Sequence, residues 1–366
     1  MVKSLQYFAV IGLFSILLTS GITLGVSALP EHVPDVAKVK AHPYAQVVIE
    51  SENLRAVAQP LYTTFGDPTN YLTGSGGPLD GAGMLILNRS DGTFGCTGGL
   101  LWTGEHVLTA AHCVTDNFGN NVLQSGTVTF NGDNGDETIV IDASGTAIHN
   151  RWNGDFIKGN DVAVLKLASV ASSDITRYDI DRSSSGDVGA IVDKVGYGRS
   201  GSGNEGDILG FGDKRNGLNQ YDDVADTMYQ ALGLKPNKDY IRGAILQYDF
   251  DNGASANDAF GFFFNQNNLG LGTSEVNSAS GDSGGPAISN GEIVGITSYG
   301  ITLTYNDGTT SDITANVLDS SFGEFSADTR VSAYAGFIDD AVGGGSDDGG
   351  TSEPKCTKGM QKRGLC

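Results

Sequence analysis

Short apolar runs separated by polar, glycine-rich stretches recur along most of the chain and predict many short β-strands. The runs fall into two successive blocks. The first block comprises residues 83–88, 98–102, 107–110, 126–131, 137–141 and 162–167. The second comprises residues 190–196, 243–249, 285–288, 292–299 and 313–317, with a short helix expected over 223–234. Short strands joined by tight turns, in a chain with 53 glycines, indicate an all-β fold of antiparallel barrels or sandwiches.

The start of the chain differs in pattern from these blocks. Residues 1–28 predict a signal peptide, with a positive charge at Lys3, an apolar core over 8–18 and a small-residue cleavage site ending at Ala28. Polar residues interrupt the apolar core too soon to favour a membrane span, although a retained anchor is the alternative. We therefore expect an exported protein, secreted or periplasmic/extracellular, with no membrane span after removal of the signal.

Three further segments have a composition of their own. Residues 29–69 show little periodicity and are interpreted as a pro-region or N-terminal extension. Residues 343–355 are rich in Gly, Ser and Asp, which is typical of a flexible linker. Residues 356–366 form a basic tail bounded by two cysteines, for which a docking tag and an inert solvated tail are the alternatives.

One segment, residues 281–286, places a serine among glycines in the sequence Gly-Asp-Ser-Gly-Gly-Pro. Glycine is unfavourable inside a strand or helix, but it suits a tight turn whose N–H groups point at a substrate oxygen. A serine that attacks an amide carbonyl creates an oxyanion, which the N–H groups of Gly281 and Ser283 are placed to stabilise. Because a serine alone is a poor nucleophile, this interpretation requires a base and a group that orients the base.

Both required groups lie upstream of the serine. His112 stands among small residues at the end of a predicted strand and is the candidate base. Asp161 opens the apolar run at 162–165, where a charge is unfavourable unless it is paired, and an imidazole N–H is a suitable partner. The order along the chain is therefore His, Asp, Ser. This is the order of the chymotrypsin-type template, and it differs from the orders in subtilisin and the α/β-hydrolases.

These motifs resemble those of the trypsin/chymotrypsin-like serine endopeptidases. Two later segments share the resemblance, Thr-Ser-Tyr-Gly at 297–300 and Thr-Arg-Val-Ser-Ala-Tyr at 329–334, the second being similar to the start of the family's C-terminal helix. The resemblance implies a peptidase domain over 70–342, built of two six-stranded antiparallel β-barrels at about 70–189 and 190–342 with a short C-terminal helix. It further implies an active site in the cleft between the barrels, protein or peptide substrates, an acyl-enzyme intermediate and no cofactor. The implied catalytic residues are His112, Asp161 and Ser283.

Four cysteines in an exported chain indicate disulfides, and the sequence alone leaves three connectivities open. The resembled family has a bridge at the place of Cys96 and Cys113, which implies that pair and leaves Cys356 to pair with Cys366. A zinc site is the alternative, but the cysteine spacings fit no zinc pattern.

The resemblance also implies roles for residues around the serine. In the family, the acid before the serine pairs with a freshly cut N-terminal ammonium, so Asp282 is the expected activation partner. The new terminus would fall near Asn70 or Tyr71, but no basic residue followed by Ile-Val-Gly-Gly stands there, and Arg55 is the nearest basic residue upstream.

The expected substrate-binding residues are Asn277 at the base of the primary pocket, Gly300 and Ser326 on its walls, and Ser298 beside it. A neutral Asn277 predicts a preference for uncharged residues before the scissile bond over Arg and Lys, because a buried substrate cation would lack a partner. The resemblance places Asp328 close to the pocket floor, and a free carboxylate there would reverse this preference.

The net charge of −21 at pH 7 argues against nucleic acid or an anionic membrane as a partner, and we expect a monomer. No metal is expected in the chemistry. Two acidic turns are candidates for a structural calcium ion, residues 131–137 and the turn that carries Asp249, Asp251 and Asn252. Simple solvation of these turns is the alternative.

A second class of function also fits an exported chain of this kind. The fold could serve as a catalytically silent binding or adhesion module on a protease scaffold. A complete set of His112, Asp161 and Ser283 in its glycine frame favours the peptidase, because a binding module has no need to keep it.

Overall fold

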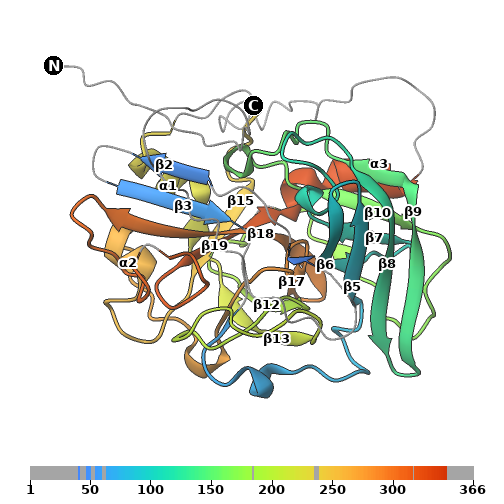
Figure 1. Cartoon of the computed structure of the whole chain (residues 1–366), viewed down its shortest axis with the longest axis horizontal. Helices are drawn as coiled ribbons and strands as arrows, with labels where there is room; N and C mark the ends of the chain where they lie inside the picture. The colour runs from blue at the N-terminus through green and yellow to red at the C-terminus, as the bar shows by residue number, and fades with distance from the viewer. Residues whose placement is uncertain are drawn as a thin grey trace.

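The chain folds mostly into β-strands with a few short helices (Figure 1). The computed structural model describes residues 40–41, 47–50, 54–59, 63–183, 185–234, 239–315 and 317–343, the first three ranges by their backbone alone. The predicted signal peptide, the predicted linker after Gly343 and the basic tail with Cys356 and Cys366 lie outside the described residues. Within the described ranges, no helix has the length and apolar character needed to cross a bilayer.

The first block of predicted strands forms a closed, six-stranded antiparallel barrel. Its strands are β5 (Ala82–Arg89), β6 (Gly92–Leu100), β7 (His106–Thr109), β8 (Leu123–Gly132), β9 (Gly135–Ile148) and β10 (Ala163–Leu167). They pair in the order β6-β5-β8-β9-β10-β7, and β7 pairs back with β6 at Gly99 and Leu100 to close the ring. A short strand, β1 (Lys40–Ala41), adds parallel to β6.

The second block forms a larger curved sheet beside the first barrel (Figure 1). Its main strands are β12 (Ile191–Gly196), β13 (Arg215–Gln220), β14 (Asp223–Val224), β15 (Ile245–Asp249), β17 (Pro286–Ser289), β18 (Glu292–Tyr305) and β19 (Phe325–Arg330). They pair in the order β13-β12-β17-β18-β19-β15-β14. Since β14 follows β13 directly along the chain, the sheet curls back on itself. The Asp222 N–H donates to the Gln247 carbonyl at 2.9 Å and the Asn219 amide to the Asp249 carbonyl at 3.0 Å, which joins the two ends.

Several short strands extend this sheet. The N-terminal extension contributes β2 (Val47–Glu50) and β3 (Leu54–Gln59), and β3 pairs antiparallel with β18. β11 (Asp179–Ile180) pairs parallel with the start of β18. A separate two-stranded sheet joins β4 (Thr63–Thr64) to β16 (Val276–Asn277).

The strand predicted at residues 313–317 is wrong. Ile313 and Val317 are 40% and 49% exposed, and the segment is a turn held by the Asp312 side chain, which accepts from the Thr314 N–H at 2.8 Å. The last strand of the sheet is instead β19, which was missed together with β13. Both strands bury polar side chains, for example Ser326 and Asp328 in β19, so neither shows an apolar period.

Within the described part of the chain, three α-helices pack beside the sheets: α1 (Ala225–Ala231), within the predicted 223–234, α2 (Ala259–Phe264) and α3 (Ala335–Gly343). The 3₁₀ turn η5 (Val331–Tyr334) leads from β19 into α3. In Figure 1, α3 crosses from the second sheet to lie beside β10 of the first barrel, where its Ile338 is fully buried. One apolar core runs through both halves, with Leu85 and Leu108 from the first and Ile296 from the second. The two halves therefore share one core and do not form separate domains.

The predicted Cys96–Cys113 disulfide is present and joins β6 to the 3₁₀ turn η2 (Ala111–Cys113). It links residues 17 positions apart in sequence, and both are buried in the core of the first barrel. A bridge of this size restricts the unfolded chain and contributes about 3 kcal/mol in the chain-entropy account. It also anchors the turn that carries His112.

Candidate active site

The edge where β7 ends and β10 begins brings together the first two predicted catalytic residues. Thr109 of β7 pairs with Ala163 of β10, so the turn after β7 and the loop before β10 leave the barrel side by side. The His112 Nδ1 lies 2.7 Å from the Asp161 Oδ2, and the His112 backbone N–H donates to the Asp161 Oδ1 at 2.9 Å. Both side chains are buried. One carboxylate thereby fixes both the backbone and the ring of the histidine.

The loop that carries Asp161 is held by residues from the second half of the chain. Ser298 of β18 donates its hydroxyl to the Asp161 Oδ2 at 2.6 Å, and Thr329 of β19 donates to the Asp161 carbonyl at 3.0 Å. Asn160 takes a left-handed conformation (φ 68°), and its N–H donates to the Tyr334 hydroxyl at 2.9 Å. Ser298, predicted as a substrate-binding residue, therefore uses its side chain to orient Asp161.

The His112 turn is packed and braced from its other side. The edge of the Phe156 ring meets the histidine ring at a centroid distance of 5.3 Å. The Arg89 guanidinium donates to the carbonyls of His112 and Cys113 at 3.2 and 3.4 Å. These contacts and the disulfide hold the turn, so the position of the imidazole is fixed by the surrounding structure.

Ser283 approaches this edge from the turn between β16 and β17. Its carbonyl accepts from the N–H of Thr97 in β6 at 2.9 Å, and the following Gly284 donates its N–H to the Thr297 carbonyl at 2.9 Å. The serine is buried, and within the described residues its Oγ accepts or donates no hydrogen bond. The Ser283 Oγ is therefore not used in a structural hydrogen bond with the described residues.

The glycines around the serine have a steric reason to be glycine. Gly281 has φ +103° and Gly284 has φ +80°, conformations that residues with a β-carbon rarely adopt. A β-carbon on Gly281 would come within 2.5 Å of the Phe211 ring. Among the described residues, neither the Gly281 N–H nor the Ser283 N–H donates a hydrogen bond. Both N–H groups are therefore unused by the described residues, and their role toward an oxyanion stays a prediction.

Asp282, the predicted activation partner, lies fully inside the protein. Its carboxylate accepts from the Gly198 N–H at 2.8 Å and from the Ala279 N–H at 3.1 Å. Burial raises the pKa of Asp282 to about 8, against the opposing effects of the Gly198 hydrogen bond and of Lys194. Within the described residues it forms no ion pair. Residue 282 is thus a buried carboxyl group in an environment that favours its neutral form unless a cation reaches it.

The predicted pocket residues are brought together. Ser326 of β19 lies opposite Gly300 of β18 and donates its hydroxyl to the Asn277 Oδ1 at 2.6 Å. The backbone N–H of Ser278 donates to the same oxygen at 2.9 Å, and all these polar groups are buried. The residue predicted at the base of the pocket is therefore a neutral amide whose oxygen accepts two hydrogen bonds.

Asp328 does not supply a free negative charge to this pocket. Its Oδ2 accepts from the Lys194 ammonium and from the Tyr221 hydroxyl, each at 2.5 Å, and Asp328 itself is fully buried. Lys194 is also buried, donates to the Thr297 hydroxyl and lies over the Tyr248 ring at 4.8 Å. The two charges offset one another, so Asp328 leaves the pocket neutral.

The N-terminal extension runs beside the site, which the sequence analysis missed. β3 pairs with β18 from Tyr305 opposite Leu54 to Gly300 opposite Gln59, and it ends two positions from Ser298. The strand has only a short alternation in its sequence, Leu-Arg-Ala-Val-Ala-Gln, which is the one signal that could have revealed it.

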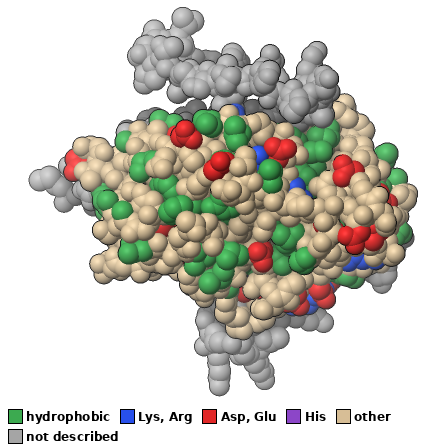
Figure 2. Space-filling model, turned by 90° about the horizontal axis from the view of Figure 1, so that it is seen from below, with side chains coloured by type: hydrophobic (Ala, Val, Ile, Leu, Met, Phe, Trp, Pro, Cys, Tyr) green, Lys and Arg blue, Asp and Glu red, His purple; other side chains and the backbone are tan. Residues whose placement is uncertain are grey.

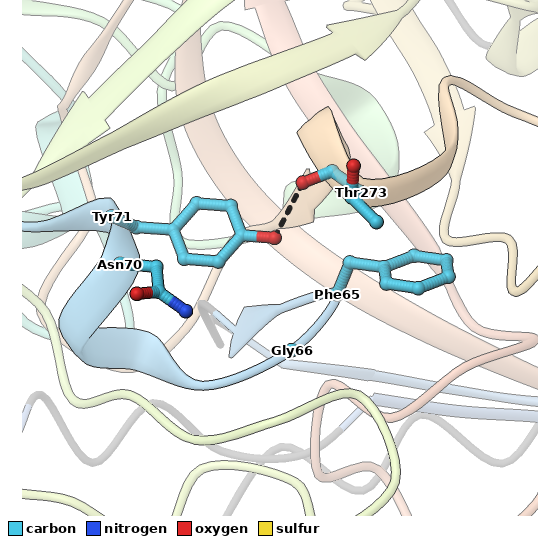
Figure 3. A pocket seen from close by; sticks show the side chains of 5 residues that line it. All are labelled: Phe65, Gly66, Asn70, Tyr71 and Thr273. Atoms are coloured by element: carbon cyan, nitrogen blue, oxygen red, sulfur yellow. Dashed lines mark hydrogen bonds between the residues drawn. The ribbon is translucent and has the colours of Figure 1, made fainter.

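The predicted new terminus at Asn70 or Tyr71 lies in the 3₁₀ turn η1 (Pro68–Tyr71), which Asp67 caps through the Thr69 N–H at 2.9 Å. A shallow pocket of about 320 Å³ opens here, shown in Figure 3. The Tyr71 hydroxyl donates to the Thr273 carbonyl at 2.6 Å and spans the pocket. The pocket is lined by Phe65, Gly66, Asn70, Tyr71 and Thr273, and by no predicted site residue.

The two acidic turns differ in how their side chains are used. Residues 131–137 form the β8–β9 hairpin, where the Asn131 amide donates to Asp136 at 2.6 Å and Glu137 accepts from the Ser172 N–H at 3.0 Å. These side chains are exposed and pair with the protein. Asp249 and Asp251, in contrast, are buried together with Asp258, while the Asn252 amide turns away to bond Asn257 at 2.8 Å. Two carboxylates of the second turn, Asp249 and Asp251, therefore form a buried cluster with Asp258.

Charged side chains are spread out on the face of the molecule shown in Figure 2. On the face shown in Figure 2, Lys and Arg side chains are visible as small separate groups among scattered Asp and Glu. This face offers no basic patch of the kind that binds a phosphate backbone.

The family model described as Trypsin matches residues 81–243 and 247–319, from β5 to the loop before β19. A solved structure described as HL collagenase is similar over 75% of this chain and 98% of its own, with 19% sequence identity and a TM-score of 0.49. No curated protein sequence matches the chain significantly.

Proposed function

Because the chain belongs to the trypsin family of serine peptidases, we propose that it is a secreted endopeptidase acting through His112, Asp161 and Ser283. The observation that carries this proposal is the bidentate hold of Asp161 on the His112 ring and backbone, at 2.7 and 2.9 Å. A histidine held in this way presents its other ring nitrogen as a base. The peptidase unit is proposed to span residues 70–342, after the signal peptide and extension.

The chemistry follows from this arrangement. His112 takes the proton of the Ser283 hydroxyl while the Oγ bonds to the carbonyl carbon of the substrate. The N–H groups of Gly281 and Ser283 stabilise the oxyanion, each worth about 3 kcal/mol of barrier. The carbon–nitrogen bond then breaks, and the imidazolium returns its proton to the leaving amine. Water, deprotonated by His112, attacks the acyl-enzyme and releases the acid and the free Ser283.

Specificity is proposed to favour uncharged side chains before the scissile bond. The Asn277 amide oxygen already accepts from Ser326 and from the Ser278 N–H, and the buried acid Asp328 is paired with Lys194. A guanidinium or ammonium entering this pocket would lose its hydration without gaining a counter-charge.

We further propose that residues 29–69 act as a pro-region. Extended peptides bind many proteins by adding a strand to a sheet edge. β3 already occupies the edge of β18 up to Gly300, two positions from Ser298. The catalytic side chains are themselves buried in the uncut chain. Removal of the extension would free this edge, and a cation reaching Asp282 would match its buried carboxyl group.

The experiment that tests the function is labelling with a fluorophosphonate probe followed by cleavage of a diverse peptide library. Labelling that depends on Ser283, together with peptide cleavage, supports the peptidase. A protein freed of its extension that neither labels nor cleaves, but still folds, would support the alternative of a silent binding module. The matched control is Ser289→Ala, which changes a serine at the end of β17 outside the site.

A further inference from the structure

Five carboxylates from four separate segments lie close enough to influence one another's charge. Asp249 ends β15, Asp251 follows it, Asp258 precedes α2, and Glu275 precedes β16. Asp222, between β13 and β14, completes the group. One oxygen from each of Asp249, Asp251 and Asp258 lies within 4.8 Å of the other two, and all three residues are buried.

Asp251 is the member of this group without a protein partner. The residue is 1% exposed, and within the described residues neither of its side-chain oxygens accepts a hydrogen bond. A buried carboxyl group with both oxygens unsatisfied is strongly unfavourable unless something else binds it. Because its oxygen lies within reach of Asp249 and Asp258, the side chain points into the cluster.

The other carboxylates are held in place by backbone N–H groups. Asp249 accepts from the Phe260 N–H at 2.8 Å, and Asp258 accepts from the Gly261 N–H at 2.6 Å. Glu275 accepts from the N–H groups of Asp251 at 2.8 Å and Leu271 at 2.5 Å. None of the five carboxylates forms an ion pair with a Lys or Arg in the part of the chain that the structure describes. The negative charge of the cluster is therefore rigidly positioned and uncompensated by protein cations.

We propose that Asp249, Asp251 and Asp258 bind a calcium ion, with Glu275 and Asp222 around it. The donor set contains only hard oxygen ligands, with no His, Cys or Met, which selects calcium or magnesium over transition metals. Calcium binds oxygen at about 2.4 Å, so oxygens bound to one ion lie at most about 4.8 Å apart, as these three do. A set of three carboxylates that can bind the ion directly suits calcium better, since magnesium usually keeps several waters and one or two carboxylates.

Protonation of the carboxyl groups is the competing explanation. Burial, together with Glu275, Asp258 and Asp222, raises the pKa of Asp251 to about 9. Burial also raises the pKa of Glu275 to about 7. A divalent cation and a set of protons both relieve the same repulsion, so the two explanations differ in what should stabilise the protein: calcium in one case, acid in the other.

The ion would brace the loop that builds the primary pocket. The Asn219 amide donates both to the Asp249 carbonyl at 3.0 Å and to the Val276 carbonyl at 2.8 Å. Val276 directly precedes Asn277, and Glu275 directly precedes Val276. A cation that fixes Asp249 is therefore connected to the segment of Asn277, the predicted base of the pocket, through the two hydrogen bonds of the Asn219 amide. Loss of the ion should raise KM for small peptides before it lowers kcat.

The test uses the full chain carrying Ser283→Ala, which prevents self-cleavage and leaves the cluster unchanged. After treatment with a chelator, calcium chloride is titrated into this protein while heat and Tm are recorded. We expect binding of one calcium ion per chain and a Tm rise of about 5 °C or more at saturation. Magnesium chloride at the same concentration should produce less than half of this rise.

The matched variants separate the two explanations. Asp251→Asn should abolish calcium binding, and in chelator its Tm should equal or exceed that of the parent, because the amide removes a repelling charge. Asp136→Asn, in the exposed β8–β9 hairpin, should bind calcium as the parent does. If Asp251→Asn does not fold, Asp258→Asn and metal analysis of the parent replace it. Absence of bound calcium, with a Tm that rises only on acidification, would overturn the proposal. An equal response to magnesium would overturn the choice of metal.

Discussion

Gly284 lies so close to Thr109 that a β-carbon at residue 284 would come within 1.9 Å of the Thr109 hydroxyl oxygen. That hydroxyl is itself fixed, since it donates to the Thr97 carbonyl at 2.8 Å. Thr109 ends the strand that leads into His112, and Gly284 follows Ser283. The close packing of Gly284 against Thr109 therefore holds the segment of Ser283 against the strand that leads into His112.

The first prediction concerns this approach. Gly284→Ala should lower kcat/KM at least about 100-fold and reduce Tm, because the new methyl group would push Ser283 away from the His112 turn. Steady-state kinetics and thermal unfolding measure the two effects. Gly291→Ala is the matched control, since Gly291 has a similar φ of +83° but open space around its β-carbon position. It should cost stability without loss of activity, and equal losses in both variants would contradict the steric explanation.

Ser283→Ala should lower kcat by about 10⁶ while leaving the fold intact, as in analogous triads. His112→Ala should be about as damaging, and the double variant should be little worse than either, because the residues act as a unit. Kinetics of the three variants on one peptide substrate measure this. Losses that multiply in the double variant would show that the two residues do not share a mechanism.

Asn277→Asp should shift cleavage toward Arg and Lys before the scissile bond by at least about tenfold relative to the parent. The substitution places a carboxylate at a buried base that the parent keeps neutral, and a substrate cation would then find a partner. Cleavage of a peptide library by both proteins measures the shift. Dominant cutting after Arg or Lys by the parent would contradict the neutral pocket that the Lys194–Asp328 pair implies.

Weakening β3 should raise the activity of the uncut chain. Successive residues of a strand direct their N–H groups to opposite sides, so Ala56→Pro and Val57→Pro between them remove a donor that faces β18. One of the two should increase cleavage of a small peptide about tenfold or more without proteolysis of the extension. The control is the unsubstituted protein freed of residues 1–62, whose activity sets the level that loss of β3 can reach. Unchanged activity in both uncut variants would argue against a pro-region that covers the site.

The metal-free protein should lose stability as the pH rises from about pH 5 to about pH 9. Burial raises the pKa of Asp251 to about 9 and that of Asp282 to about 8, so the folded chain holds protons that the unfolded chain has released. The folded state binds more protons over this range, and the free energy of unfolding therefore falls with rising pH. Denaturant unfolding in chelator measures the slope, which should be shallower for Asp251→Asn. Stability that increases over the same range would contradict this.

The strands of the first barrel could be predicted from the sequence because their inward faces are apolar. The same reasoning failed for β13 and β19, whose inward faces carry Asn219, Ser326 and Asp328. Those side chains are satisfied by partners far away in the chain, such as Lys194 for Asp328. A local pattern contains no information about such partners, so buried polar strands escape it.

The candidate site also contains residues that could be predicted from the sequence and residues that could not. His112, Asp161 and Ser283 could be identified because each stands in a short motif with its own chemical reason. Asp258 and Glu275 could not be added to Asp249 and Asp251, because the fold of the loop at 250–275 is needed to bring them together. The obstruction of β18 by the extension also depends on a long-range pairing that six residues of weak alternation do not reveal.

The C-terminal helix α3 has a consequence for how the molecule is made. Ile338 is fully buried against the first barrel. The ring of His149, which directly follows β9, packs edge-on against the rings of Tyr334 and Phe337 at centroid distances of 5.0 and 5.2 Å. The first barrel, whose last strand ends at Leu167, is thus covered by residues that follow the last strand of the second sheet. The first half alone should therefore stay incompletely folded until residues 331–343 are available to cover it.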